Sequence, residues 1–146
     1  MAKVAQRQVV AKITPKSVGG HETGPSIPDY FSQVSGGEIT ASVEKVYVGG
    51  KQFPEVLCAP AEIGDITITR HWDQGDHTNL QKLRQLVGRT YYDITVETLD
   101  CDLKVPGSAR NYPNALLVGV TEPEGDASSG APATYALTFS ISTVSV

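Results

Sequence analysis

Hydrophobic and polar residues alternate along the last third of the chain. Successive side chains of a strand point to opposite faces, so the run from Thr134 to Ser142 predicts a strand with two different surfaces. One face carries the large apolar side chains Tyr135, Leu137, Phe139 and Ile141, and the other carries Thr134, Ala136, Thr138, Ser140 and Ser142. A second alternating run spans Ala115–Thr121. The acidic segment between the two runs is rich in Gly, Ser and Pro, so residues 115–146 predict a β-hairpin with a long tip.

The same alternation predicts strands throughout the chain. They are expected at Val4–Ile13, Glu38–Val43, Asp65–Trp72 and Arg89–Asp100, with a hairpin over Lys45–Phe53. Gly49 and Gly50 favour that hairpin because a two-residue turn requires positive φ angles. The stretch Asn111–Pro113 predicts a turn into the C-terminal hairpin. These elements predict a mainly β protein, either a β-sandwich or a barrel.

One helix and one long connection interrupt this pattern. Residues 76–88 predict a helix, because Leu80 and Leu83 recur at helical spacing and Gly88 suits a left-handed C-cap. The segment from Pro15 to Gly37 is crowded with Gly and Pro and predicts an extended loop. Its large apolar residues predict that this loop docks on another surface.

Length and charge narrow the functional classes. The chain has 146 residues, enough for one domain with a substantial core, and its net charge is −4. General nucleic-acid binding needs a basic surface, so the acidic balance argues against it. No apolar run approaches the ~20 residues of a membrane helix, and no secretion signal is visible. Cys58 and Cys101 are therefore expected to be reduced and mostly buried thiols.

The densest polar cluster spans Arg70–His77 and contains two histidines and two aspartates. A metal site is one interpretation, but the spacing matches no zinc pattern, and a strand-to-helix turn explains the same residues. No nucleophile motif or phosphate-binding loop is present, so the chain is not expected to be an enzyme or to need a cofactor. Asp93 and Glu97 are better explained as carboxylates of a solvated sheet face than as an acid–base pair.

Three segments together resemble the tail tube proteins of long-tailed, siphovirus-type bacteriophages. They are DITITRHWDQGDHTNLQKLRQLVG at Asp65–Gly88, ITV at Ile94–Val96, and LLVGVTEPEGDASSGAPATYALTFSIS at Leu116–Ser142. The resemblance covers most of the chain from about Ile39 onward. It implies a single tail-tube domain over residues 1–146, with a β-sandwich or barrel-like fold and one flanking helix.

The resemblance also implies a structural role in the virion. Six copies would close into a ring, and the rings would stack into a tube around a tape measure protein, bounded by tail tip and terminator proteins. DNA would pass through the lumen without specific binding. The tube would be assembled in the host cytoplasm, with no contact to a membrane.

Two sets of residues are candidates for such an assembly. A lumen should be polar and free of basic groups, because Lys and Arg there would hold phosphates. The candidate lumen-facing residues, on one strand face or both, are Asp93, Thr95, Glu97, Thr134, Thr138, Ser140 and Ser142. The candidate inter-ring contacts in the long connection are Ile27, Tyr30, Phe31 and Val34, because interfaces favour buried aromatic and apolar anchors.

Two alternatives remain open from the sequence. A tube protein of a contractile tail or of a type VI secretion-like system would share this fold. A monomeric β-sandwich binding module would instead present Trp72, Tyr91 and Tyr112 to a sugar or peptide.

Overall fold

The computed structural model describes residues 3–17, 19–20, 22–27, 30–104 and 106–142. The strands are β1 (Val9–Lys16), β2 (Gln33–Gly36), β3 (Ile39–Ala41), β4 (Lys45–Val46), β5 (Glu55–Val56), β6 (Ala61–Ile63), β7 (Ile66–His71), β8 (Tyr91–Leu99), β9 (Pro106–Thr121) and β10 (Thr134–Ser140). The helical elements are the 3₁₀ turns η1 (Gln6–Gln8) and η2 (Gln74–Asp76) and the α-helix α1 (His77–Gln85).

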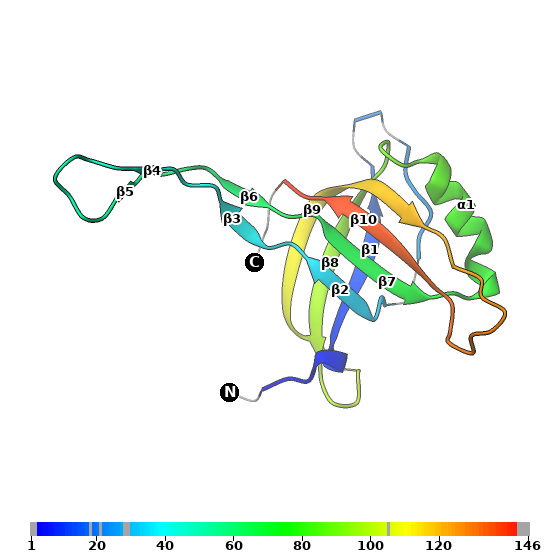
Figure 1. Ribbon diagram of the computed structural model, residues 1–146. Helices are drawn as coiled ribbons and strands as arrows, with labels where there is room; N and C mark the ends of the chain where they lie inside the picture. The colour runs from blue at the N-terminus through cyan, green and yellow to red at the C-terminus, as the bar shows by residue number, and fades with distance from the viewer. Residues whose placement is uncertain (1–2, 18, 21, 28–29, 105, 143–146) are drawn as a thin grey trace.

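Six of these strands curl into a barrel. Their order is β1-β8-β9-β10-β7-β2, and every neighbouring pair is antiparallel. The two ends of the sheet meet where Ala11 of β1 and Phe31, just before β2, exchange backbone hydrogen bonds of 3.0 and 2.7 Å. Figure 1 shows the resulting curved wall, with α1 on one side. The mainly β fold with one flanking helix is therefore confirmed.

Alternation along the strands fills the barrel. The side chains of β10 follow the predicted pattern, because Tyr135, Leu137 and Phe139 are buried while their neighbours are not. The buried cluster continues around the barrel through Ala11, Ile13, Ile66, Ile68, Tyr92, Ile94, Val96, Tyr112, Ala115 and Leu117. Burial of this apolar surface is the main force that holds the barrel closed.

The helix lies inside the predicted range and is shorter than expected. Leu80 and Leu83 enter the common core and anchor it. The Asp73 side chain accepts a hydrogen bond from the Gly75 backbone in the 3₁₀ turn that leads into the helix. Gly88 has a φ of +80° and donates its N–H to the Leu117 carbonyl at 2.7 Å, which ties the chain back to the barrel. No helix in the described ranges has the length and hydropathy needed to span a membrane.

The long connection is only partly a loop. Residues 22–27 lie against the barrel, where the Tyr92 hydroxyl donates to the Pro25 carbonyl at 2.9 Å and the Thr90 hydroxyl donates to the Glu22 carbonyl at 3.0 Å. The stretch after Phe31 becomes strand β2, which pairs with β7. The prediction of one extended loop over residues 15–37 is therefore wrong at both ends, because Pro15 and Lys16 belong to β1 and Gln33–Gly36 form β2.

Strand β9 is longer than the sequence predicts. It runs through Asn111–Pro113, where a turn was expected, so that expectation is wrong. The pairing register between β8 and β9 shifts opposite this point, between Tyr92 and Ile94, and Asn114 has a φ of +55°. A local bulge thus absorbs the Pro and Asn residues while the strand continues.

Candidate assembly surfaces

A long ribbon projects from the barrel between β2 and β7. We call residues 38–64 the arm. It contains two short antiparallel pairs, β3 with β6 and β4 with β5, and it reaches well beyond the barrel wall (Figure 1). Each leg, at about 3.3 Å per residue, can extend up to about 40 Å. A ribbon of this kind has no core of its own, so its stability depends on what it contacts.

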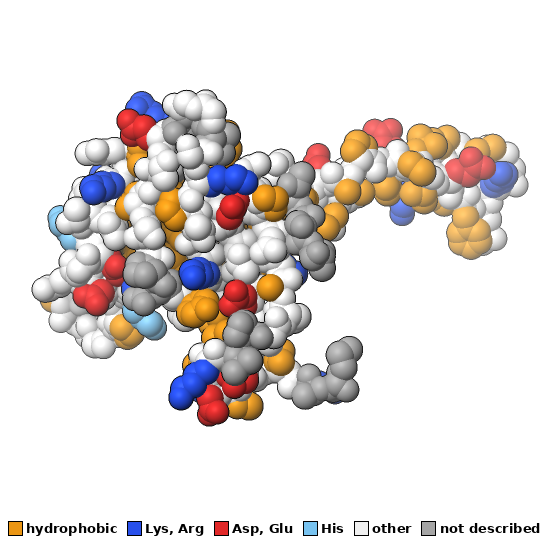
Figure 2. All heavy atoms as spheres, turned by 180° about the vertical axis from the view of Figure 1, so that it is seen from behind, with side chains coloured by type: hydrophobic (Ala, Val, Ile, Leu, Met, Phe, Trp, Pro, Cys, Tyr) orange, Lys and Arg blue, Asp and Glu red, His pale blue; other side chains and the backbone are white. Residues whose placement is uncertain are grey.

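Among the residues that the structure describes, most of the exposed large apolar side chains lie on the arm. They are Ile39, Val43, Val46, Tyr47, Val48, Phe53, Val56 and Leu57, and they are 40–78% exposed. Figure 2 shows these hydrophobic groups distributed along the whole arm. Contiguous exposed apolar surface of this kind marks an interaction site in a soluble protein.

The root of the arm has one apolar and one polar face. Ile39 pairs with Ile63 and Ala41 pairs with Ala61, so these four residues share a face. Thr40 pairs with Glu62 on the opposite face. The sequence predicted the hairpin, but not that its apolar side chains are exposed. The sequence did contain an indication of this exposure, because apolar residues occupy both faces of the predicted hairpin around Gly49 and Gly50.

A second surface covers four neighbouring strands and carries no charge. Outward-facing residues of β2, β7, β10 and β9 align in two rows across the sheet. The first row is Ser35, Thr67, Thr138 and Gly119, and the second is Gln33, Thr69, Ala136 and Thr121. We call these eight residues the neutral face. None of these eight residues carries a charge.

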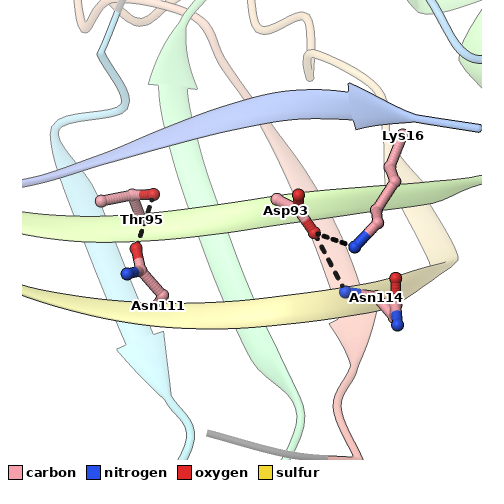
Figure 3. Close-up of polar contacts among 5 residues, drawn as sticks. All are labelled: Lys16, Asp93, Thr95, Asn111 and Asn114. Carbon is pink, nitrogen blue, oxygen red and sulfur yellow. Dashed lines mark hydrogen bonds and ion pairs between the residues drawn. The ribbon is translucent and has the colours of Figure 1, made fainter. Parts of the chain in front are cut away.

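A third surface, on β1, β8 and the first half of β9, is charged. Lys16 Nζ lies 3.6 Å from Asp93 Oδ1, which also accepts a hydrogen bond from the Asn114 backbone at 3.1 Å. The Thr95 hydroxyl donates to Asn111 Oδ1 at 3.0 Å (Figure 3). These contacts join three neighbouring strands into a polar network, which we call the charged face.

The candidate lumen residues therefore fall on two different surfaces. Asp93, Thr95 and Glu97 belong to β8, whereas Thr134, Thr138 and Ser140 belong to β10. Strand β9 separates β8 from β10, so these faces point in different directions around the barrel. Within the second set, Thr138 lies in the neutral face, Thr134 pairs with His71 and Ser140 pairs with Leu116. Ser142 is exposed just beyond the end of β10.

The four candidate inter-ring residues differ in their burial. Ile27 is 2% exposed and Phe31 is fully buried, so both belong to the barrel core. The ring of Phe31 packs edge-on against Tyr135 at a centroid distance of 6.1 Å. The expectation that Ile27 and Phe31 anchor a neighbouring ring is wrong, because the chain uses them for its own packing. Val34 is half-buried beside the same core.

Tyr30 remains at the surface, 42% exposed. Its hydroxyl donates to Glu97 Oε2 at 3.4 Å. The negative charge of Glu97 raises the pKa of Tyr30, because ionised tyrosine would face the carboxylate. The exposed phenol can therefore act as a neutral hydrogen-bond donor at physiological pH.

The polar cluster Arg70–His77 forms a strand-to-helix corner. Asp76 is nearly buried, and its carboxylate lies 3.7 Å from Arg70 Nη1. Trp72 packs edge-on against His77 and against Tyr135. Among the residues that the structure describes, no group of three or more His, Cys, Asp and Glu side chains is placed to hold a metal ion.

The remaining sequence candidates are distributed across the surface and core. Tyr112 is 2% exposed, so the expected aromatic patch of Trp72, Tyr91 and Tyr112 does not exist as one surface. Cys58 lies on the arm and Cys101 follows β8; both are exposed free thiols, so the expectation that they are buried is wrong.

Comparisons with known proteins are informative at the level of structure. No family model matches the sequence, and no curated protein matches it. A chain of the PVC extracellular contractile injection system, in its sheath–tube complex, superimposes with a TM-score of 0.71 at 20% identity. That match covers 97% of this chain and 89% of the other.

Two further solved structures have a similar fold. One is the baseplate of the anti-feeding prophage, with a TM-score of 0.73 at 15% identity over 99% of this chain and 95% of that one. The other is Hcp1 from Flavobacterium johnsoniae, with a TM-score of 0.58 at 14% identity over 93% of both chains. At these identities the likeness establishes a shared fold.

Proposed function

We propose that this chain is a structural protein that polymerises into the hollow tube of a contractile, injection-type particle. The arm is the observation that carries the proposal. An isolated subunit leaves eight large apolar side chains of the arm exposed, and only a partner can remove them from water. The similar structures come from a sheath–tube complex and a baseplate of injection-type particles, which supports a tube over a free binding module.

A tube protein of a contractile system is now the favoured interpretation, in place of a tube protein of a siphovirus-type tail. The solved relatives include an extracellular contractile injection system and Hcp1, whereas the sequence resemblance had favoured a long, non-contractile phage tail. The sixfold symmetry of the anti-feeding prophage baseplate supports hexameric rings for this chain as well. In this proposal the tube is part of a virion-like particle made in the host cytoplasm.

We assign the lumen to the neutral face. A channel wall that carries no Lys or Arg leaves phosphates unbound, and one without large apolar groups gives unfolded polypeptide little to adhere to. The eight residues of the neutral face meet both conditions across four adjacent strands. The charged face, with Lys16 and Asp93, then points away from the lumen.

The proposed partners follow from this arrangement. The chain contacts copies of itself within and between rings, and the similar structures of a PVC sheath/tube terminator and of an anti-feeding prophage cap support end-capping proteins. A sheath protein would surround the tube. A tape measure protein would fill it during assembly, and cargo, including DNA, would pass without specific binding.

Electron microscopy of the purified chain over a concentration series tests the proposal. We expect stacked rings or hollow tubes that become more abundant as concentration rises, because open head-to-tail polymers form above a threshold. Monomers at every concentration, also after addition of tube ends from a related particle as seeds, would contradict it.

A further inference from the structure

A polar hollow lies between the end of α1 and residues 22–27. It has a volume of about 450 Å³, and its lining includes Glu22, Lys82, Leu86 and Arg89. We call it the helix hollow. Lys82 and Arg89 are exposed, and in the described part of the chain neither side chain makes a hydrogen bond or an ion pair. Two cations against the single carboxylate of Glu22 leave the hollow with a net positive charge.

Both walls of the helix hollow are fixed to the barrel. On one wall the Thr90 hydroxyl donates to the Glu22 carbonyl at 3.0 Å. The Tyr92 hydroxyl donates to the Pro25 carbonyl of the same segment at 2.9 Å. On the other wall Leu83 anchors the helix in the core. The hollow is therefore pre-organised, and a group that enters it need not order its walls.

The segment that joins β9 to β10 carries the opposite charge. Residues 122–126 contain Glu122, Glu124 and Asp126, and we call them the acidic loop. Among the described residues, those that line the hollow of about 500 Å³ beside this loop include no Lys, Arg or His. The Ser128 hydroxyl and backbone N–H donate to Asp126 Oδ1 at 2.7 and 3.0 Å. These bonds hold the pKa of Asp126 below its ordinary value, so the carboxylate is ionised at physiological pH.

Within one chain the acidic loop and the helix hollow lie on opposite flanks of α1. Arg84 Nη1 contacts Glu122 Oε1 at 2.7 Å, which ties the start of the loop to one flank. Lys82 is two residues before Arg84 and therefore about 200° away around the helix. Gln85 and Leu86, three and four residues after Lys82, share its flank and also line the hollow. The body of the helix thus stands between the loop and the hollow of its own chain, and the hollow is open to the loop of a second copy.

We propose that the acidic loop of one copy enters the helix hollow of a neighbouring copy, where its carboxylates meet the two unpaired cations. The groups that face one another are Glu124 and Asp126 on the loop, and Lys82 and Arg89 in the hollow. This inference rests on the proposed function, because it names a contact by which tube subunits recognise each other. The contact joins two different surfaces, so it repeats head to tail from copy to copy. Charge complementarity of this kind sets the orientation and the rate of encounter.

Zero-length cross-linking of assembled tubes tests the pairing in the unmodified chain. A water-soluble carbodiimide activates a carboxylate, and the Lys82 amine attacks it. An amide forms while the reagent takes up the elements of water and leaves as a urea. We expect mass spectrometry to find Lys82 joined to Glu124 or Asp126. In tubes from an equal mixture of unlabelled and isotope-labelled chains, part of this product should combine both labels, which shows that it joins two copies.

The same digest contains its own control. Lys51 Nζ lies 2.8 Å from Glu55 Oε1 within one chain, so this pair should cross-link in tubes and in dilute monomers alike. The Lys82 product should appear only in tubes. Tubes that yield the Lys51 product without any Lys82 product to the acidic loop would overturn the inference and leave the proposed function intact. A Lys82 product that never combines both labels would overturn it as well, because the contact would then lie within one chain.

Exchange of the charges gives a second, independent test. The hollow variant carries Lys82→Glu and Arg89→Glu. The loop variant carries Glu124→Lys and Asp126→Asn, and the asparagine keeps an acceptor for Ser128. Each should raise the concentration needed for tube formation by roughly tenfold or more, because attraction across the contact is replaced by repulsion. The chain with all four substitutions should recover most of this loss, because opposite charges again face one another.

A matched control separates this contact from a general effect of charge. Lys12→Glu with Lys104→Glu changes the net charge as the hollow variant does, at two exposed positions outside both surfaces. It should assemble near the threshold of the unmodified chain. Equal thresholds for the control and the hollow variant, or no recovery in the fourfold variant, would overturn the inference. Absence of tubes from the unmodified chain up to its solubility limit would overturn the function and the inference together.

Discussion

The phenol of Tyr92 occupies the space that a Cβ atom on Gly24 would need. An ideal Cβ built on Gly24 would clash with the Tyr92 hydroxyl and ring. This close approach lets the hydroxyl donate to the neighbouring Pro25 carbonyl at 2.9 Å. Burial raises the pKa of Tyr92 far above its ordinary value, so the phenol stays protonated and continues to donate. The segment over residues 22–27 is held on the barrel by this contact.

Gly24→Ala should therefore destabilise the monomer. Overpacking of this kind costs typically 1–3 kcal/mol, because either the segment over residues 22–27 or the Tyr92 ring must move, so about 2 kcal/mol is expected. Urea unfolding of the monomer measures the change. Tyr92→Phe in the Gly24→Ala background should recover part of the loss, since it removes the nearest clashing atom. Strictly additive effects of the two substitutions would show that the contact is not responsible.

Phe31 and Tyr30 are adjacent in sequence and should respond in opposite ways. Phe31→Ala should lower the free energy of unfolding by about 3–5 kcal/mol, because it empties a fully buried site in the core. Tyr30→Ala should change it by well under about 1 kcal/mol, because the side chain is 42% exposed. Urea unfolding of both monomers decides between a core role and an interface role for Phe31. A small effect of Phe31→Ala would restore the inter-ring interpretation.

The sequence predicted the strands that bury one face. On β10 a strict two-residue period separates Tyr135, Leu137 and Phe139 from small neighbours, and the burial of the strand follows this period. The sequence did not predict that β9 continues through Pro113. A proline and an asparagine usually signal a turn, and the shift in pairing register with the neighbouring strand β8, which makes room for a bulge, is not visible in the sequence of β9.

The assembly surfaces were harder to predict from the sequence. Phe31 looked like an exposed anchor because the stretch from Pro15 to Gly37 is crowded with Gly and Pro, yet a backbone pair with Ala11 draws it into the core. The neutral face needed the cross-strand register, since its residues come from four separate strands. The sequence of one strand was enough to propose Thr138 as a lumen residue. Its alignment with Ser35 and Thr67 could not be predicted from that strand alone.

Removal of the arm should separate folding from assembly. A chain in which residues 40–62 are replaced by a short Gly-Ser turn should keep a folded barrel, because none of the arm residues from 40 to 62 lies in the buried core cluster. It should form no tubes, because it lacks the exposed apolar side chains that a neighbouring copy covers in the proposed function. Circular dichroism and electron microscopy measure the two properties. Normal tubes from this chain would contradict the assignment.

Deletion of residues 15–37 can be compared with removal of the arm. If residues 15–37 were only an extended docking loop, as the sequence predicted, this deletion would leave a folded domain. The structure predicts instead that it abolishes folding, because it removes Ile27, Phe31 and strand β2. A cooperative unfolding transition from this variant would show that the core tolerates their loss.

Thr138 and Thr95 distinguish the two surfaces that the sequence nominated for the lumen. Each is replaced singly by cysteine in the Cys58→Ser, Cys101→Ser background, and both are half-buried hydroxyl positions in central strands. In monomers, a maleimide linked to a large polyethylene glycol should label both. In tubes, we expect the Thr138→Cys site to be protected, because a lumen admits the polymer only through its ends. A small maleimide should label it in both states, which excludes burial in a subunit interface. Protection of the Thr95→Cys site alone would move the lumen to the charged face.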